Sequence, residues 1–330
     1  MKSKILKWLA IGVAAVALAA PAHAERKIRI GTISSQGSPW HKAMLRFAEV
    51  ADKESNGQIK VQVFTDGQLG DINQMYSSMQ LGTLEMGYFG LAAITQLKGA
   101  EPLNILFAPY LFKSAAAAEK VANTDEFKKL YDDAAGKTGI RVVAAFGQRS
   151  ARAIQTTKGP ITKPEDLKGL RLRVPSIEML KATFEGLGVQ VTPMGMLDIY
   201  TAMSRGTVVG QDNGFDLAMP LKFHEVAKHW SATDHVYELT GWFMSDKLWG
   251  SLTEIERRAL VKASEAGGEV TTIETRKLDA DSIDTLKKTG GTYTVPDRAA
   301  FESALKNVHA PYEGKLWPVG MVDRIRKLQN

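Results

Sequence analysis

Residues 27–67 read KIRIGTISSQGSPWHKAMLRFAEVADKESNGQIKVQVFTDG, and this stretch decides the fold class. Its two ends, 27–35 and 58–67, alternate apolar and polar residues and are rich in β-branched side chains, which is typical of half-buried strands. Between them, 38–57 carries apolar residues at spacings of three and four behind Ser38, which can cap a helix. A strand, a helix and a second strand in this order predict a parallel α/β unit.

The same alternation continues along the chain. A helix is expected over 71–82 and a third strand over 83–90. In the second half, strands are expected over 139–147, 167–175, 189–194 and 207–214, with helices over 176–188 and 197–206. Two such series indicate two domains rather than one large sheet. Thr253 and Glu256 then have the spacing of a capping box and predict the start of a long helix, followed by a short strand, a helix and a C-terminal tail.

The first 24 residues have the features of a secretory signal peptide. Three lysines precede an apolar run of 13 residues, Trp8 to Ala20, and a small-x-small motif ends at Ala24. The run is too short to span a bilayer as a mature helix, and cleavage is expected after Ala24. The mature chain would then be periplasmic, with a net charge of 6 − 3 = +3 because the three lysines are removed.

Composition excludes several function classes. Of the 330 residues 44% are hydrophobic and none is cysteine, which excludes disulfides, thiolate catalysis and cysteine-bound metals. The histidines of the mature chain lack zinc-site spacing, and no nucleophile elbow, P-loop or dinucleotide fingerprint is present. Lysine and arginine are scattered among acids, so nucleic-acid binding has no support. No metal or cofactor is expected.

The segment DLKGLRLRVPS, 166–176, places two arginines on one strand. Because residues two apart share a face, Arg171 and Arg173 lie opposite the leucines and the valine. Arg173 stands at the carboxyl end of the strand, where ligands bind in open α/β sheets, and a guanidinium there offers a planar fork to a carboxylate. From these residues alone, ligand contact and a structural salt bridge both stay open for Arg173. Arg171 is expected to be solvated.

Several motifs together point to a known family. QLGD at 68–71, DLKGLRLRVP at 166–175 and TPMGMLDIYTAMSRGTVVGQDN at 192–213 occur in the order and at the spacing of that family. In these segments the chain resembles the DctP-type periplasmic solute-binding proteins of TRAP transporters, and the resemblance covers roughly the whole mature chain. It implies an α/β fold of the two-lobed, type II-like periplasmic binding protein class, with a hinge and a long connecting helix.

The resemblance also implies how the chain divides. Residues 1–24 would be the signal peptide. Lobe 1 would comprise 25–148 plus about 239–278, and lobe 2 would comprise 149–238 plus about 279–330.

The function implied by the resemblance is that of a receptor. It would capture an organic acid, such as a sugar acid or a short hydroxy- or dicarboxylate, and deliver it to the small and large TRAP membrane subunits, which use an ion gradient. A monomer without enzymatic activity is expected. Two other classes stay open: a periplasmic enzyme acting on an anionic substrate, and a module that presents its ligand to a sensor or an ATP-driven importer.

Site residues carry over where this sequence matches the family's motifs. The arginine of LRVP, which binds the ligand carboxylate in the family, is Arg173 here, and the asparagine of GQDN is Asn213. For a second pocket arginine, counting back from Ile161 favours Arg152, whereas the glycine-x-arginine context favours Arg149. The remaining contacts are expected from strand ends and the loops after them: Trp40, Gln68, Tyr88 and Phe89 in lobe 1, and Met196 in lobe 2.

Overall fold

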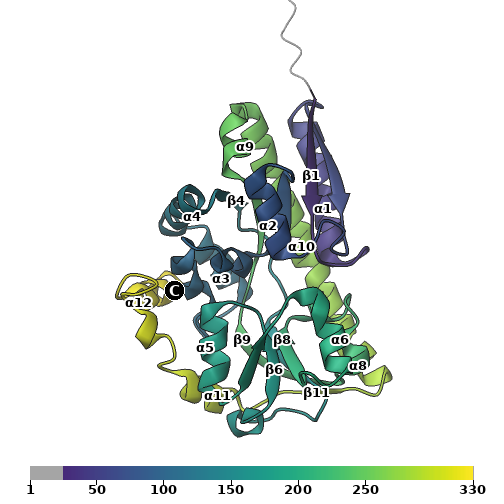
Figure 1. The fold of residues 1–330 in the computed structure, drawn as a ribbon, viewed down its shortest axis with the longest axis vertical. Helices are drawn as coiled ribbons and strands as arrows, with labels where there is room; N and C mark the ends of the chain where they lie inside the picture. Colours follow the sequence, from purple (N-terminus) through teal and green to yellow (C-terminus); the bar gives the residue numbers. More distant parts are fainter. Residues whose placement is uncertain (1–24, 330) are drawn as a thin grey trace, which may run out of the picture.

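The computed structural model describes residues 25–329, so the predicted signal peptide lies outside the described residues. Two sheets, one above the other in Figure 1, form two lobes. The upper sheet, the centre of lobe 1, has the order β2 (Ile59–Phe64), β1 (Arg26–Gly31), β3 (Met86–Gly90), β10 (Thr240–Ser245) and β4 (Ile140–Ala144). β1 pairs in parallel with β2 and β3, which confirms the predicted parallel α/β unit. β10 runs antiparallel to both its neighbours.

The lower sheet is the centre of lobe 2. Its order is β11 (Thr292–Thr294), β9 (His229–Val236), β5 (Arg152–Thr156), β8 (Gly210–Asn213), β6 (Arg171–Val174) and β7 (Gln190–Pro193). β6 is parallel to β7 and β8, whereas β5 is antiparallel to β8, with Ala153 opposite Asn213. The start of β5 therefore meets the carboxyl ends of β6 and β8 at one edge of the sheet.

Helices cover both sheets. Lobe 1 carries α1 (Pro39–Glu54), α2 (Ile72–Leu81), α3 (Ala115–Ala122), α4 (Asp125–Thr138) and α9 (Asp246–Ser251). Lobe 2 carries α5 (Glu178–Gly186), α6 (Ile199–Ser204), α7 (Phe215–Ala218), α8 (Phe223–Val226) and α11 (Arg298–Leu305). The predicted cap of α1 is confirmed, because the Ser38 side chain accepts a hydrogen bond from the backbone N–H of His41. Short 3₁₀ turns, among them η1 (Leu91–Gln96), complete the connections.

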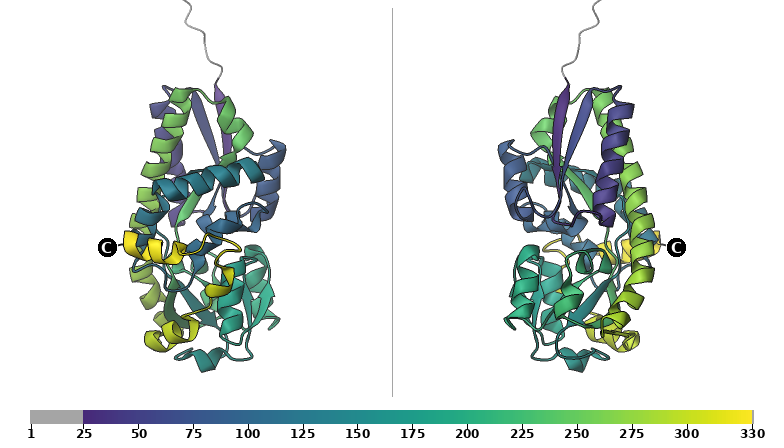
Figure 2. Two further views of the ribbon diagram at one scale, coloured as in Figure 1. Left: turned by 90° about the vertical axis from the view of Figure 1, so that its left-hand side faces the viewer. Right: turned by 90° about the vertical axis from the view of Figure 1, so that its right-hand side faces the viewer.

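The long helix α10 (Glu254–Lys288) runs along one side of the molecule past both lobes (Figure 2). It begins with the predicted capping box, in which the Thr253 side chain accepts a hydrogen bond from the backbone N–H of Glu256. Gly267 allows α10 to lie close to the upper sheet, because a Cβ there would sit 2.6 Å from the ring of Trp242. Within residues 25–329, no helix is both long and apolar enough to cross a membrane.

The exact lobe boundaries stay a prediction. Sheet membership changes between β4 and β5 and again between β9 and β10, near the two predicted crossing points. The C-terminal segment, however, does not stay with lobe 2. Its last helix, α12 (Met321–Leu328), lies beside lobe 1, where Arg324 pairs with Glu126 and the Gln329 side chain donates to the carbonyl of Leu111 (Figure 2).

Three local predictions need correction. The helix expected over 176–188 does not start at Ser176; α5 begins at Glu178 behind Ile177 and has no side-chain cap. β10 was not predicted, because it is buried on both faces and its sequence does not alternate. The supposed C-terminal tail contains α12, whose three apolar residues Met321, Val322 and Ile325 are buried against the rest of the chain.

Candidate ligand-binding site

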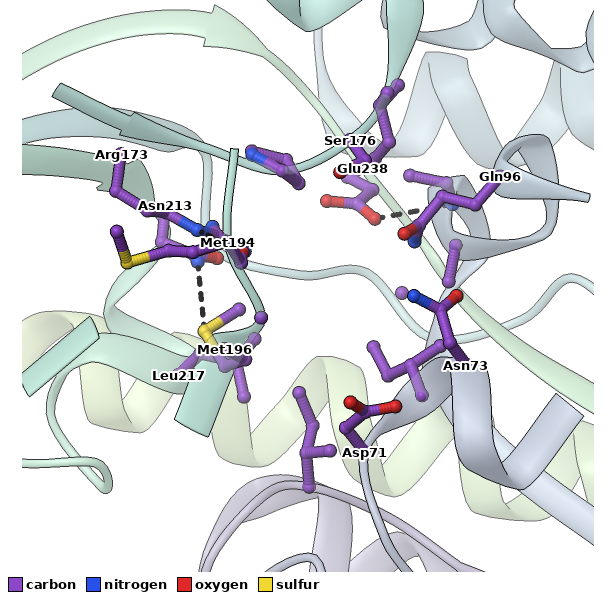
Figure 3. A pocket seen from close by; sticks show the side chains of 18 of the residues that line it. Asp71, Asn73, Gln96, Arg173, Ser176, Met194, Met196, Asn213, Leu217 and Glu238 are labelled. Atoms are coloured by element: carbon purple, nitrogen blue, oxygen red, sulfur yellow. Dashed lines mark hydrogen bonds between the residues drawn. The ribbon is translucent and has the colours of Figure 1, made fainter. Parts of the chain in front are cut away.

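A cavity of about 130 Å³ lies between the two lobes (Figure 3). One water-sized probe occupies roughly 10–15 Å³, so the space suits a small organic molecule rather than a single ion. Lobe 1 contributes Ile33, Trp40, Asp71, Ile72, Asn73 and the segment around η1, including Gln96. Lobe 2 contributes three arginines, Asn213, Leu217, and loop residues after β6 and β7, including Met194 and Met196. Glu238, between β9 and β10, completes the wall.

The pairing of the lower sheet brings the three arginines together. Arg173 lies near the carboxyl end of β6, and Arg152 begins the antiparallel strand β5 at the same edge. Arg149 lies three residues before Arg152, on the connection from lobe 1. All three are nearly inaccessible, with 3–5% of each residue's surface exposed. Such burial of cations is unfavourable unless anions accompany them.

Two of the arginines are paired with buried carboxylates. Arg149 Nε donates to Asp216 Oδ2 at 2.7 Å, and Arg152 Nε donates to Asp212 Oδ2 at 2.7 Å. Glu238 Oε2 accepts from the Nη1 atoms of both Arg149 and Arg152. One carboxylate thus bridges two guanidinium groups, and together with Asp212 and Asp216 it compensates their charges.

The pairing shifts the pKa values of Arg149, Arg152 and Asp212 toward their charged forms. Burial by itself would lower the pKa of Arg149 and Arg152, but the adjacent carboxylates outweigh it and raise both pKa values. Burial would likewise raise the pKa of Asp212, yet Arg152 and His235 hold that pKa well below its usual range. Arg149, Arg152 and Asp212 are therefore charged at neutral pH.

In the part of the chain that the structure describes, Arg173 has no carboxylate partner. Its Nε donates to the carbonyl of Met194 at 3.0 Å, whereas its buried Nη1 has no hydrogen-bond partner among the described residues. Burial lowers the pKa of Arg173 to about 10, so the group is still a cation at neutral pH. A buried, charged and unsatisfied guanidinium facing a cavity is suited to bind an anion there.

The side chains around the arginines tie the lobes together. Trp40 of α1 donates from Nε1 to Asp216 Oδ2 at 3.1 Å, and the Arg149 guanidinium lies 4.9 Å from the centre of its ring. Asn213 accepts from Arg149 Nη2 at 3.0 Å, and its amide nitrogen lies 3.6 Å from the sulfur of Met196. The walls therefore combine hydrogen-bonding groups with polarisable apolar surface.

Comparison with known proteins identifies the family. Residues 30–315 match the model described as bacterial extracellular solute-binding protein, family 7, the DctP family. The chain belongs to this family. It is 30% identical over 311 residues to a solute-binding protein of Verminephrobacter eiseniae, covering 94% of this chain and 91% of that one. It is 29% identical to the C4-dicarboxylate-binding periplasmic protein DctP of Rhodobacter capsulatus, covering 89% of each.

Solved structures of solute-binding proteins have a similar fold. A TRAP periplasmic solute-binding protein of Actinobacillus succinogenes with bound L-galactonate has a TM-score of 0.86 and 26% identity, covering 92% of this chain and 99% of that one. The sugar-acid-binding protein of Advenella mimigardefordensis in complex with galactonate has a TM-score of 0.85 and 25% identity, covering 93% and 98%. The two-lobed α/β architecture is thus the fold of TRAP solute-binding proteins, a family of periplasmic receptors.

Six of the nine residues predicted for the DctP-type site line the cavity: Arg149, Arg152, Arg173, Asn213, Trp40 and Met196. The choice between Arg149 and Arg152 was therefore not exclusive, since both reach the wall and both are bound to Glu238. Their direct contact with a ligand stays a prediction. Arg171, expected to be solvated, is exposed and donates to the carbonyl of Gly206.

The other three predicted residues are not at the cavity. Tyr88 and Phe89 are fully buried in β3, the central strand of the upper sheet; Tyr88 stacks on Trp242, and Phe89 stacks on Phe243. Helices cover both faces of that strand, so its side chains enter the core, and the cavity is reached by Gly90 at its end and by residues after it. Gln68 is exposed in the turn before α2.

The acids of the site were missed. Asp212 and Asp216 flank the predicted Asn213, and both are completely buried. A signal was present in GQDNGFD, because one acid in a buried strand, Asp212, and a second in the helix directly after it, Asp216, require cationic partners when both are buried. Asp71, which was not among the predicted site residues, caps α2 and also lines the cavity. Glu238 had no local signal. Among residues 25–329 no cluster of His, Asp or Glu is arranged to hold a metal ion.

Behind the cavity, Asp279 of α10 supports the loop that carries Arg149. The hydroxyl of Ser150 donates to Asp279 Oδ1 and accepts from the backbone N–H of Asp216 at 2.9 Å. Burial raises the pKa of Asp279 to about 7, and the negative charges of Asp216 and Asp234 act in the same direction.

Asp279→Asn is expected to stabilise the protein at pH 8 but not at pH 4. Because the folded-state pKa lies above the ordinary 3.8, the free energy of unfolding falls as pH rises through that window to about 7. Asparagine keeps a hydrogen-bond acceptor for Ser150 and does not ionise. The gain at pH 8 should be on the order of 1–2 kcal/mol, since part of the carboxyl still contacts water.

Thermal unfolding of the wild type and the variant at both pH values measures this effect. The exposed Asp281→Asn, two residues along the same helix, is the control and should change neither midpoint. An equal shift at pH 4 and pH 8 would contradict the role of Asp279 ionisation.

Proposed function

We propose that this protein is the periplasmic receptor of a TRAP transporter and captures an organic acid in the cavity between its lobes. Its signal peptide would be cleaved after Ala24, and the loaded receptor would deliver its ligand to the small and large membrane subunits. The observation that carries the proposal is Arg173, a buried cation at the cavity that has no carboxylate partner within residues 25–329. A ligand carboxylate would supply that partner.

Hydrogen bonds between the lobes support a closing motion. The Trp40 indole of lobe 1 donates to Asp216 of lobe 2, and the Ser35 hydroxyl donates to the carbonyl of Pro220 at 3.2 Å. An anion that contacts both walls would favour the closed arrangement over the open one, because only the closed one provides all its contacts. The crossings near 148 and 238 and the helix α10 would act as the hinge.

The relatives support the class of ligand. The relatives named above include a C4-dicarboxylate-binding protein, and the solved structures include proteins with bound galactonate. From this likeness we infer that the ligand of this chain is an organic acid. The protein would release it chemically unchanged, as a receptor does and an enzyme does not.

Two measurements test the function. Mass spectrometry of small molecules released from freshly purified, denatured protein should find an organic acid in near-stoichiometric amount. A thermal-shift panel of organic acids should raise the unfolding midpoint, because a ligand that binds only the folded state stabilises it. If no acid in the panel raises the midpoint, or if the bound compound is converted during incubation, the receptor function is wrong.

A further inference from the structure

We propose that the cavity selects acids with a single carboxylate and a hydroxylated far end, and that Asp71 excludes a second carboxylate. This inference rests on the proposed function, since it assumes that Arg173 binds the carboxylate of an organic acid. It narrows the ligand to monoanions of the aldonate type and assigns to one residue of lobe 1 the discrimination against dicarboxylates and aldarates.

The arginine cluster has no net formal charge. The three arginines are faced by three buried carboxylates, Asp212, Asp216 and Glu238, so their charges sum to 3 − 3 = 0. Arg149 and Arg152 already donate to these carboxylates. Of the three arginines, Arg173 is the one with a guanidinium nitrogen, the buried Nη1, that has no hydrogen-bond partner among the described residues. In the described wall of the cavity, Arg173 is thus the one arginine without a carboxylate partner, and a second ligand carboxylate would meet arginines that are already paired.

The wall of the cavity opposite Arg173 carries polar side chains of lobe 1. Figure 3 shows Asp71, Asn73 and Gln96 across the cavity from Arg173 and Asn213. Asp71 Oδ1 caps α2 by accepting from the backbone N–H of Gln74 at 2.9 Å, and no hydrogen bond to its Oδ2 is present among the described residues. The side-chain amides of Asn73 and Gln96 are also without protein partners there.

The side chains of Asp71, Asn73 and Gln96 favour hydroxyl groups as hydrogen-bonding partners. An ionised carboxylate has only acceptor atoms, so Asp71 favours a hydroxyl donor and repels a carboxylate. Two amides beside it can both donate to and accept from hydroxyls. A ligand fixed by its carboxylate at Arg173 would extend a hydroxylated end toward this wall, whereas a dianion would direct its second charge toward Asp71. Like charges facing each other across an interface suppress the wrong partner.

Matched pairs of acids test the inference. Galactonate and galactarate differ only at the terminal carbon, which is a hydroxymethyl group in one and a carboxylate in the other; erythronate and meso-tartrate form the same pair with four carbons. Titration calorimetry at pH 7.5 with the mature protein measures both pairs. In the pair whose aldonate binds, the aldarate should bind on the order of 100-fold more weakly.

Asp71→Asn should reduce that ratio by at least about tenfold, mainly by strengthening aldarate binding, because asparagine removes the charge and still caps a helix. Asp297→Asn is the matched control. Asp297 caps α11 in the same way, accepting from the backbone N–H of Ala300 at 3.0 Å, and it does not line the cavity. The control should leave the ratio unchanged. Because the readout is a ratio of two affinities, a general loss of stability does not mimic it.

The outcomes distinguish a failure of the proposed selectivity from a failure of the proposed receptor function. An aldarate that binds as tightly as its aldonate, or an unchanged ratio in Asp71→Asn, overturns the exclusion and leaves the receptor function standing. Binding of other monocarboxylates with neither aldonate bound overturns the hydroxylated far end. If no organic acid of any class binds, the proposed function itself is wrong.

Discussion

Arg173→Ala is expected to raise the dissociation constant for the ligand carboxylate by roughly 30-fold to several thousand-fold, which corresponds to about 2–5 kcal/mol. The reason is that Arg149 and Arg152 already bind Asp212, Asp216 and Glu238 and cannot replace the lost donors without breaking those pairs. The ligand anion would enter a buried site without a cation of its own. Titration calorimetry with an acid found by the thermal-shift panel measures the change.

Lysine should not restore binding at this position. A guanidinium presents two N–H donors in a plane to the two oxygens of a carboxylate, whereas an ammonium is a single point charge on a flexible stem. In addition, the Nε of Arg173 is held by the Met194 carbonyl at 3.0 Å, which fixes the direction of the fork. Arg173→Lys is therefore expected to bind far more weakly than the wild type.

The stability of the ligand-free protein separates a binding role from a structural one. Since Arg173 is buried and has no carboxylate partner among the described residues, its replacement by alanine should not lower the unfolding midpoint and is expected to raise it slightly. Arg171→Ala is the control on the same strand, because its side chain is exposed and bonds only the Gly206 carbonyl. Unchanged affinity in Arg173→Ala, together with a lowered midpoint, would mean that Arg173 is a structural residue.

The local sequence pattern was enough to place Arg173. The alternation of apolar and charged residues assigned the face of its side chain, and Pro175 marked the end of the strand. It was not enough for Tyr88 and Phe89, whose strand is covered on both faces, so that position in a strand did not determine which side chains reach the cavity. Only tertiary packing decides such a case.

The pairing of arginines with carboxylates could not be predicted for a different reason. Arg152 meets Asp212 over a sequence separation of 60 residues and Glu238 over one of 86. No periodicity connects residues that far apart, and an acid between two strands gives no sign of its partner. The sequence therefore predicted a site with cations, and only the fold showed that most of their charge is already compensated.

Glu238→Ala is expected to lower the free energy of unfolding by about 3–5 kcal/mol, the usual loss when one partner of a buried ion pair is removed. Glu238 is 3% exposed, and its Oε2 accepts from both Arg149 and Arg152. Its Oε1 also faces the backbone N–H of Ala92 at 3.4 Å, which joins the connection between β9 and β10 to lobe 1. Alanine would leave two buried guanidinium groups to share Asp212 and Asp216.

Urea unfolding of the ligand-free protein measures this loss, with Glu49→Ala as the control. Glu49 is exposed and pairs with Arg46 one helical turn away, so its removal should change the free energy of unfolding by less than about 0.5 kcal/mol. Glu238→Gln should fall between the two, since an amide oxygen still accepts one guanidinium hydrogen bond but carries no charge. A loss below about 1 kcal/mol in Glu238→Ala would show that water or a neighbouring carboxylate compensates both arginines, and that the bridge is not what holds them in place.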